Sequence, residues 1–159
     1  MALLDGDLLN AAAGLKNFSA LKGRGARFMA GDILVIDESY NANPSSMTAA
    51  LALLAQAKGR RIAVLGDMLE MGTEADAHHA ALAAPIAAAD TDLVFLTGAR
   101  MKALWEALPA ARRGGHTATS AELAPQLTAA LRPGDTVLVK GSFGSRMAVI
   151  IDALRARGR

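Results

Sequence analysis

The chain has 159 residues, of which 52% are hydrophobic and 20% are charged, and this balance excludes an intrinsically disordered protein. A net charge of +2 is too small to argue for nucleic acid or an anionic membrane as a partner, and the absence of cysteine excludes disulfide bonds and thiol nucleophiles. The acidic start Met1–Asp7 does not fit a signal peptide, and no apolar run approaches the length of a membrane span. We expect a cytoplasmic globular domain that binds neither nucleic acid nor membrane.

The first 22 residues differ in pattern from the rest. Apolar residues at helical spacing indicate a short helix over Leu8–Leu15, interrupted by Gly14. Its apolar face is large for a free N-terminal arm. Two interpretations stay open: residues 1–22 are the remnant of a preceding domain with its linker, or they form an ordinary first helix that packs on the domain at residues 23–159.

From residue 23 onward, short apolar runs alternate with apolar positions spaced three and four residues apart, which predict strands and helices respectively. The strands are expected at residues 28–30, 33–36, 61–65, 92–97, 116–119 and 135–140. The helices are expected at residues 44–57, 73–89, 101–108, from 120 onward and at 146–155. Pro85 should kink or split the second helix, and Pro125 leaves open a later start of the fourth.

This alternation predicts an α/β fold with a mostly parallel sheet and helices on both faces. A turn at residues 31–32 predicts an antiparallel hairpin at the sheet edge. Right-handed crossovers place every strand-to-helix loop along one edge, so the polar loops at residues 37–43, 66–73, 97–100 and 140–145 should lie together. Open parallel sheets bind their ligands at that edge.

The loop from Asp37 to Asn43 holds Asp, Glu, Ser, Tyr and two Asn in seven positions. Asn43 followed by Pro44 is typical of a helix N-terminus, whose free amide groups favour anions. The sequence contains neither a complete P-loop nor Gly-x-Gly-x-x-Gly after the first strand. The segment Gly141–Ser145 either presents amides to an anion or is a structural turn.

The three histidines do not predict a metal site. His78 and His79 are adjacent on a helix and point about 100° apart, and His116 lies in a glycine-rich turn. We expect surface or capping roles for them.

The acidic pair Asp37–Glu38, with Thr97 and Lys140 at other strand ends, also resembles a phosphorylatable receiver domain. The detail differs, because Thr97 stands where the phosphoacceptor Asp should be and Gly141 replaces the usual proline after the lysine. A standalone nucleotide-binding or receiver-like signalling module is therefore the alternative function.

Three strings closely resemble the C-terminal domain of the Mur ligases, and among them the ligases that add D-alanyl-D-alanine to UDP-N-acetylmuramoyl-tripeptide. They are Asp-Glu-Ser-Tyr-Asn-Ala-Asn-Pro at residues 37–44, Gly-Asp-Met-Leu-Glu-Met-Gly at 66–72 and Val-Lys-Gly-Ser at 139–142. The resemblance implies a three-domain, ATP-dependent enzyme of peptidoglycan synthesis, in which a Rossmann-like C-terminal domain closes over the nucleotide. A central P-loop domain, absent from this chain, would phosphorylate the tripeptide carboxylate and hold most of the Mg²⁺ ligands. The isolated chain is then expected to be inactive.

The resemblance also assigns residues. The candidates for ATP are Arg24, Asp37, Tyr40, Asn41 and Asn43, and those for the incoming dipeptide are Lys140, Gly141, Ser142 and Arg146. Many family members carry Arg and Glu where this chain has Phe143 and Ala148, and Arg146 would supply the missing cation from a shifted position. No catalytic residue and no metal ligand are expected in this domain.

Overall fold

The computed structural model describes residues 22–158, so the helix expected over Leu8–Leu15 and both interpretations of residues 1–22 lie outside the described residues. The strands are β1 (Ala26–Ala30), β2 (Ile33–Glu38), β3 (Arg61–Gly66), β4 (Leu93–Thr97), β5 (Arg113–Thr117) and β6 (Thr136–Lys140). The α-helices are α2 (Pro44–Leu54), α3 (Ala75–Ala81), α4 (Ala83–Ala88), α5 (Met101–Ala107), α6 (Ser120–Ala130) and α7 (Ala148–Arg157). Short 3₁₀ turns are η1 (Gly72–Glu74), η2 (Ala110–Arg112) and η3 (Phe143–Ser145).

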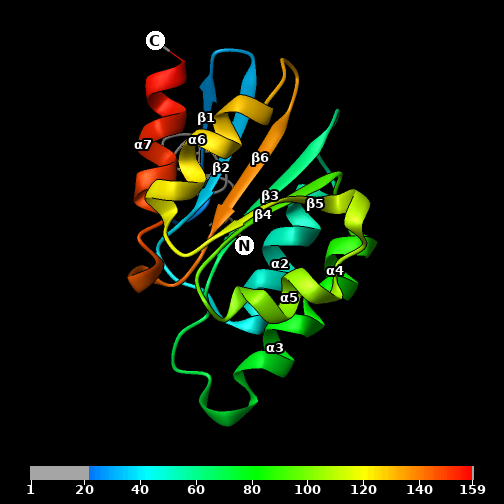
Figure 1. Cartoon of the computed structure of the whole chain (residues 1–159). Coiled ribbons are helices and arrows are strands. Elements are labelled where there is room, and N and C mark those ends of the chain that lie inside the picture. Colours follow the sequence, from blue (N-terminus) through cyan, green and yellow to red (C-terminus); the bar gives the residue numbers. More distant parts are fainter. Residues whose placement is uncertain (1–21, 159) are drawn as a thin grey trace, which may run out of the picture.

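The strands form one sheet in the order β1-β2-β6-β3-β4-β5 (Figure 1). β1 and β2 pair antiparallel, and the other neighbouring strands pair in parallel. The expected α/β fold with an antiparallel edge hairpin is confirmed. The insertion of β6 between β2 and β3 places the last strand of the chain in the middle of the sheet.

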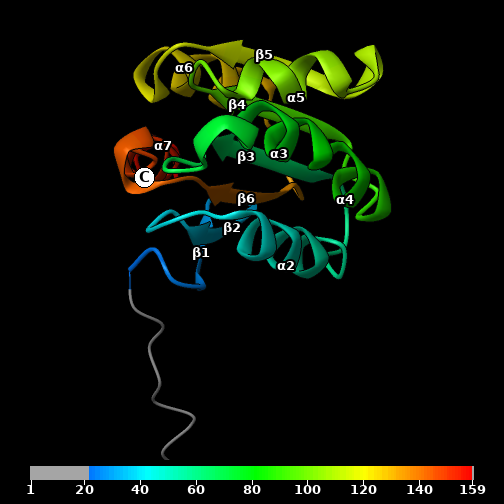
Figure 2. The same ribbon diagram turned by 90° about the horizontal axis from the view of Figure 1, so that it is seen from below.

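Helices cover both faces of the sheet, with α2, α3, α4 and α5 on one face and α6 and α7 on the other (Figures 1 and 2). Each inner strand sends alternate apolar side chains to the two sides, as in β3, where Leu65 joins the core under α2–α5 and Val64 joins the core under α6 and α7. Because both faces are buried, these strands are continuous apolar runs rather than alternating ones.

The clearest difference from the expected element bounds is in β5. β5 begins at Arg113 instead of at His116, because Gly114 and Gly115 lie in the strand and do not form a turn. A Cβ on Gly114 would lie 2.7 Å from the ring of Phe95, so the glycines make room for that ring. α6 begins at Ser120, as expected, and accommodates Pro125, so the alternative of a later start is wrong.

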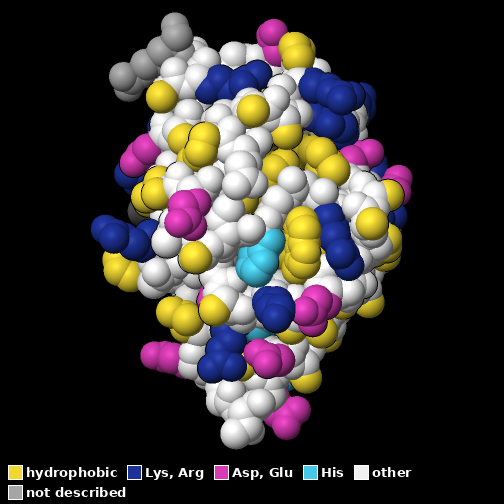
Figure 3. All heavy atoms as spheres, in the orientation of Figure 1, with side chains coloured by type: hydrophobic (Ala, Val, Ile, Leu, Met, Phe, Trp, Pro, Cys, Tyr) yellow, Lys and Arg dark blue, Asp and Glu magenta, His cyan; other side chains and the backbone are white. Residues whose placement is uncertain are grey.

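The helix expected over residues 73–89 is divided, as Pro85 predicted. The break falls at Leu82, between α3 and α4, because a proline ring clashes with the carbonyl region one turn earlier. No helix within residues 22–158 combines the length and the apolarity needed to cross a bilayer. On the face seen in Figure 3, basic and acidic side chains are interspersed with hydrophobic ones.

Candidate functional site

Loops from four parallel strands meet at the carboxyl edge of the sheet. The backbone N–H of Ser142, after β6, donates to the carbonyl of Asp67, after β3, at 3.0 Å. The carboxylate of Asp67 in turn accepts from the backbone N–H of Met101 at 3.0 Å, which ties in the loop after β4. The expectation that these loops share one edge is confirmed.

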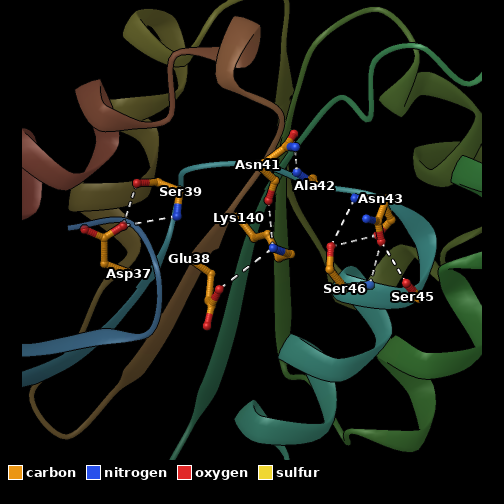
Figure 4. A network of polar contacts seen from close by, with 9 residues as sticks. All are labelled: Asp37, Glu38, Ser39, Asn41, Ala42, Asn43, Ser45, Ser46 and Lys140. Carbon is orange, nitrogen blue, oxygen red and sulfur yellow. Dashed lines mark hydrogen bonds and ion pairs between the residues drawn. The ribbon is translucent and has the colours of Figure 1, made fainter. Parts of the chain in front are cut away.

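The loop after β2 is fixed at its start by Asp37. This side chain is fully buried, and one of its oxygens accepts hydrogen bonds from the Ser39 N–H at 3.1 Å and the Ser39 hydroxyl at 2.5 Å (Figure 4). Its other oxygen has no hydrogen-bond partner among residues 22–158. Asp37 therefore fixes the start of the loop from a buried position. One of its two carboxylate oxygens receives no hydrogen bond from the described residues.

The same loop is fixed at its end by Asn43, which caps α2. The Asn43 side-chain oxygen accepts from the Ser46 N–H at 2.8 Å and the Ser45 hydroxyl at 2.9 Å, while the Ser46 hydroxyl accepts from the Asn43 N–H at 3.0 Å (Figure 4). This reciprocal capping box confirms the predicted helix start. It leaves the Asn43 amide NH₂ group as the part of that side chain available to a ligand.

Between these two anchors, Tyr40 and Asn41 are exposed to solvent. The guanidinium of Arg24 lies 4.1 Å from the centre of the Tyr40 ring, a cation–π contact. The Asn41 side-chain oxygen accepts from the Ala42 N–H at 2.8 Å, which leaves its NH₂ group free of that bond. Tyr40, Arg24 and Asn41 thus expose an aromatic ring, a cation and an amide group next to one another.

Lys140, at the end of β6, lies beneath this loop and is 3% exposed. Its Nζ donates to the carbonyl of Asn41 at 2.8 Å and lies 3.9 Å from the carboxylate of Glu38 (Figure 4). Burial lowers the pKa of Lys140, and the nearby Glu38 carboxylate offsets only part of this effect.

Ser142 is also buried, and its hydroxyl accepts from the Leu69 N–H at 2.9 Å and donates to the Ala42 carbonyl at 3.4 Å. Gly141 lies against Gly66, and a Cβ there would be 3.0 Å from the Gly66 Cα and 2.7 Å from the Met147 side chain. The glycine permits the loops after β3 and β6 to touch.

Three cavities open at this edge, and one of them, of about 430 Å³, is lined by residues that include Asn41 and Ser142. Each of the other two shares lining residues with it. One, of about 490 Å³, is lined by residues that include Tyr40 and Phe143, and the other, of about 400 Å³, is lined by residues that include Asp67 and Thr119. Arg146 lines these last two cavities, and its left-handed backbone has φ of 52°. Arg146 is exposed and takes part in none of the ion pairs found among residues 22–158.

A family model described as the Mur ligase, glutamate ligase domain matches residues 23–143. The chain belongs to the Mur ligase family. It is 37% identical over 149 residues to the UDP-N-acetylmuramoyl-tripeptide--D-alanyl-D-alanine ligase of Escherichia coli, an alignment that covers 92% of this chain and 32% of that protein. The chain therefore spans about a third of the length of this relative.

Solved structures of Mur ligases share the fold. MurF from Acinetobacter baumannii superposes with a TM-score of 0.84 at 29% identity, over 94% of this chain and 34% of that one. MurF ligase from Thermotoga maritima, solved in complex with ADP, superposes with a TM-score of 0.77 at 19% identity, over 94% of this chain and 36% of that one. The second likeness concerns the fold alone.

The candidate residues of this Mur ligase domain fall into two groups. Arg24, Tyr40, Asn41, Asn43 and Arg146 are exposed at this edge. The other four, Asp37, Lys140, Gly141 and Ser142, are buried beneath them. No cluster of three His, Cys, Asp or Glu side chains suited to a metal ion occurs within residues 22–158.

Three residues outside the ATP and dipeptide candidates also hold this edge of the sheet together. Asp67 caps α5, and Glu38 neighbours Lys140 across the paired strands. His79 is fully buried; its Nε2 accepts from the Met68 N–H at 2.9 Å, and its Nδ1 lies 2.6 Å from the Ala75 carbonyl. The expectation of a surface position is wrong for His79, while a loop-capping role fits it. The apolar stripe on α3 is too short to show which face of the helix is buried. The sequence therefore did not predict the burial of His79.

Proposed function

We propose that the chain is the C-terminal domain of an ATP-dependent ligase that adds D-alanyl-D-alanine to UDP-N-acetylmuramoyl-tripeptide during peptidoglycan synthesis. The observation that carries the proposal is the likeness to the E. coli ligase of that name along 92% of the chain. Because the chain spans about a third of that relative, the complete reaction requires the remaining parts of such an enzyme.

We assign the contacts to ATP to the exposed loop and to Arg24 beside it. The Tyr40 ring and the Arg24 guanidinium offer stacking and a cation, and the amide groups of Asn41 and Asn43 offer hydrogen bonds to a base or a ribose. Asp37 is buried under the same loop and holds Ser39, so it would support the nucleotide site through the loop rather than contact the ligand. The Thermotoga neighbour that shares this fold was solved in complex with ADP.

We place the contacts to the incoming dipeptide along the loop after β6. Arg146 stands free between two of the cavities, and a guanidinium is suited to the terminal carboxylate of a dipeptide. Gly141 brings this loop against the loop after β3, while Lys140 and Ser142 support it from below. Phe143, which is 79% exposed, lines one of these cavities together with Arg146.

The chemical task of the domain is placement. A carboxylate is a poor electrophile, so ATP would transfer its terminal phosphoryl group to the tripeptide carboxylate and leave as ADP. The dipeptide amine would then attack the acyl phosphate, lose a proton and displace inorganic phosphate. Domain closure over the reactants would position them and exclude water. The Mg²⁺ expected for the complete enzyme would be bound mainly by the central domain.

A titration of the 159-residue chain with ATP, followed by ¹H–¹⁵N NMR, tests the proposal. We expect weak binding with shifts centred on Tyr40 and Asn41. Tyr40→Ala and Asn41→Ala should weaken it, whereas Met29→Ala, which removes an exposed apolar side chain of β1, should not. ATP-dependent ligation by this chain alone would contradict its assignment as one part of the enzyme, and unchanged affinity in both loop variants would remove those residues from the site.

A further inference from the structure

Two consecutive carbonyl groups of the exposed loop are each received by a side chain from the end of β6. The Asn41 carbonyl accepts from Lys140 Nζ at 2.8 Å, and the Ala42 carbonyl accepts from the Ser142 hydroxyl at 3.4 Å. The partners are 99 and 100 residues apart in the chain. Lys140 and Ser142 are two residues apart on the same strand end, and both point toward the same loop.

The burial of Lys140 argues against direct contact with a substrate. Its side chain is 4% exposed, and its ammonium group lies under the backbone of Asn41. Figure 4 shows the Lys140 side chain between Glu38 and Asn41, below the path of the loop. A ligand above the loop therefore meets the side chains of Tyr40 and Asn41 first.

A contribution to the stability of the fold also does not explain why the charged Lys140 occupies this position. Glu38 lies 3.9 Å from Lys140 Nζ and is itself 26% exposed, so the ion pair is long and partly solvated. A buried charge of this kind costs desolvation, and an apolar side chain of similar volume is often as stable. The contact that distinguishes lysine from such a replacement is the hydrogen bond to the Asn41 carbonyl.

This bond holds the middle of a segment whose two ends are already fixed. Asp37 binds Ser39 at the start, and the capping box of Asn43 holds the end. With its carbonyl turned inward to Lys140, Asn41 keeps its side chain and that of Tyr40 exposed. A loop ordered before binding spares the ligand the entropic cost of ordering it.

We propose that Lys140 is a positioning residue, which fixes the Tyr40–Ala42 segment in the conformation that receives a nucleotide, with Ser142 as a second support. The identity of the ligand rests on the proposed function, whereas the positioning of the loop does not. Lys140 and Ser142 then act on the nucleotide side through the backbone of the loop, although the sequence places them in the acceptor motif.

The test compares Lys140→Met, Ser142→Ala and the control Lys102→Met in the 159-residue chain. Lys102 is an exposed lysine of α5 that pairs with Glu106 at 3.7 Å, away from the loop. Amide hydrogen exchange is measured at Tyr40, whose N–H donates to the Gly23 carbonyl at 3.0 Å, and at Ala42. ATP affinity is measured by NMR titration of the same samples.

We expect Lys140→Met to remain folded, to accelerate exchange at Tyr40 and Ala42 about tenfold relative to distant amides, and to weaken ATP binding about fivefold, because fewer molecules hold the receptive conformation. Ser142→Ala should shift both quantities in the same direction by less and supplies the test if the methionine variant does not fold. Lys102→Met should leave both unchanged.

The outcomes separate this inference from the proposed function. Unchanged exchange in both loop variants overturns the positioning role, and so does a loss of ATP affinity without faster exchange, which would make Lys140 a direct ligand. Faster exchange in a chain whose wild type binds no ATP supports positioning and contradicts the nucleotide function of the isolated domain.

Discussion

The carboxylate of Asp67 accepts a hydrogen bond from the backbone N–H of Met101, 34 residues later in the chain, at 3.0 Å. The N-cap residue of α5, Arg100, makes no side-chain cap, so Asp67 in the loop after β3 supplies the acceptor. An acidic side chain at the ligand edge of the sheet thus serves the first turn of a helix. It also ties the loop after β3 to the loop after β4.

Asp67→Ala should destabilise the domain by about 1–2 kcal/mol, since it leaves the first amide groups of α5 without their acceptor. Urea unfolding at neutral pH measures the difference. Asp76→Ala is the matched control, because Asp76 pairs with the exposed Arg100 guanidinium at 3.4 Å and is itself 72% exposed. That variant should cost less than about 0.5 kcal/mol. Equal losses for the two variants would show that the cap contributes nothing specific.

Asp135 gives a prediction about pH. Burial works to raise the pKa of this carboxyl, but hydrogen bonds from Arg60 and from the Arg132 N–H outweigh it and hold the pKa below its usual value of 3.8. Because the folded pKa is depressed, the stabilisation is fully present above pH 3.8 and is lost as pH falls through the folded pKa. Stability should therefore fall on acidification in that window.

Asp135→Asn should cost about 2–4 kcal/mol near neutral pH, because it breaks the paired contacts with Arg60 at 2.8 and 2.9 Å. The difference between wild type and variant should shrink below pH 3.8, as the wild-type carboxyl takes up its proton. Unfolding curves at a series of pH values measure it. A difference that stays constant down to acid unfolding would contradict the assignment.

Gly141→Ala should destabilise the domain by about 1–3 kcal/mol, because the new methyl group meets the backbone of Gly66 and the side chain of Met147. Gly144→Ala is the control within the same loop. Its methyl group would meet only the end of the exposed Leu69 side chain, which can turn away. Thermal unfolding of the two variants distinguishes the close contact between Gly141 and Gly66 from a general effect of alanine in this loop. An unchanged unfolding temperature in Gly141→Ala would contradict the close contact.

His79→Leu should cost about 1–3 kcal/mol, because the Met68 N–H loses its buried acceptor. Since Nε2 accepts this hydrogen bond, Nδ1 carries the ring hydrogen and donates it to the Ala75 carbonyl. The neighbouring His78 is partly exposed, and His78→Leu should change stability by less than about 0.5 kcal/mol. Faster amide exchange at Met68 in the first variant alone would localise the effect to the loop after β3.

The periodicity of apolar residues was sufficient to predict most strands and helices, because the inner strands are buried on both faces and the helices carry regular stripes. β5 was the exception. Two glycines that are typical of a turn lie in that strand, and the reason is the ring of Phe95 on the neighbouring β4. This cause lies in the packing of two neighbouring strands, and the local sequence around the glycines does not reveal it.

The candidate site was predictable to a different extent. The Asn43 cap follows from the Asn-Pro pair, and the convergence of the loops follows from crossover handedness. The burial of Lys140 under Asn41 depends on β6 entering the sheet between β2 and β3, with Lys140 opposite Glu38. Because strand order is not encoded in local spacing, the sequence placed Lys140 on the ligand edge but could not show that it faces the loop.

The most direct test of the central claim is a chimeric enzyme. Residues 23–158 replace the corresponding segment of the 37% identical E. coli ligase, and ATP-dependent product formation from UDP-N-acetylmuramoyl-tripeptide is measured with D-alanyl-D-alanine or D-glutamate as acceptor. A thermal shift with ADP first establishes that the chimera is folded and binds nucleotide. The account predicts product with D-alanyl-D-alanine and none with D-glutamate. A folded, nucleotide-binding chimera that uses D-glutamate, or that forms no product with the dipeptide, would contradict it.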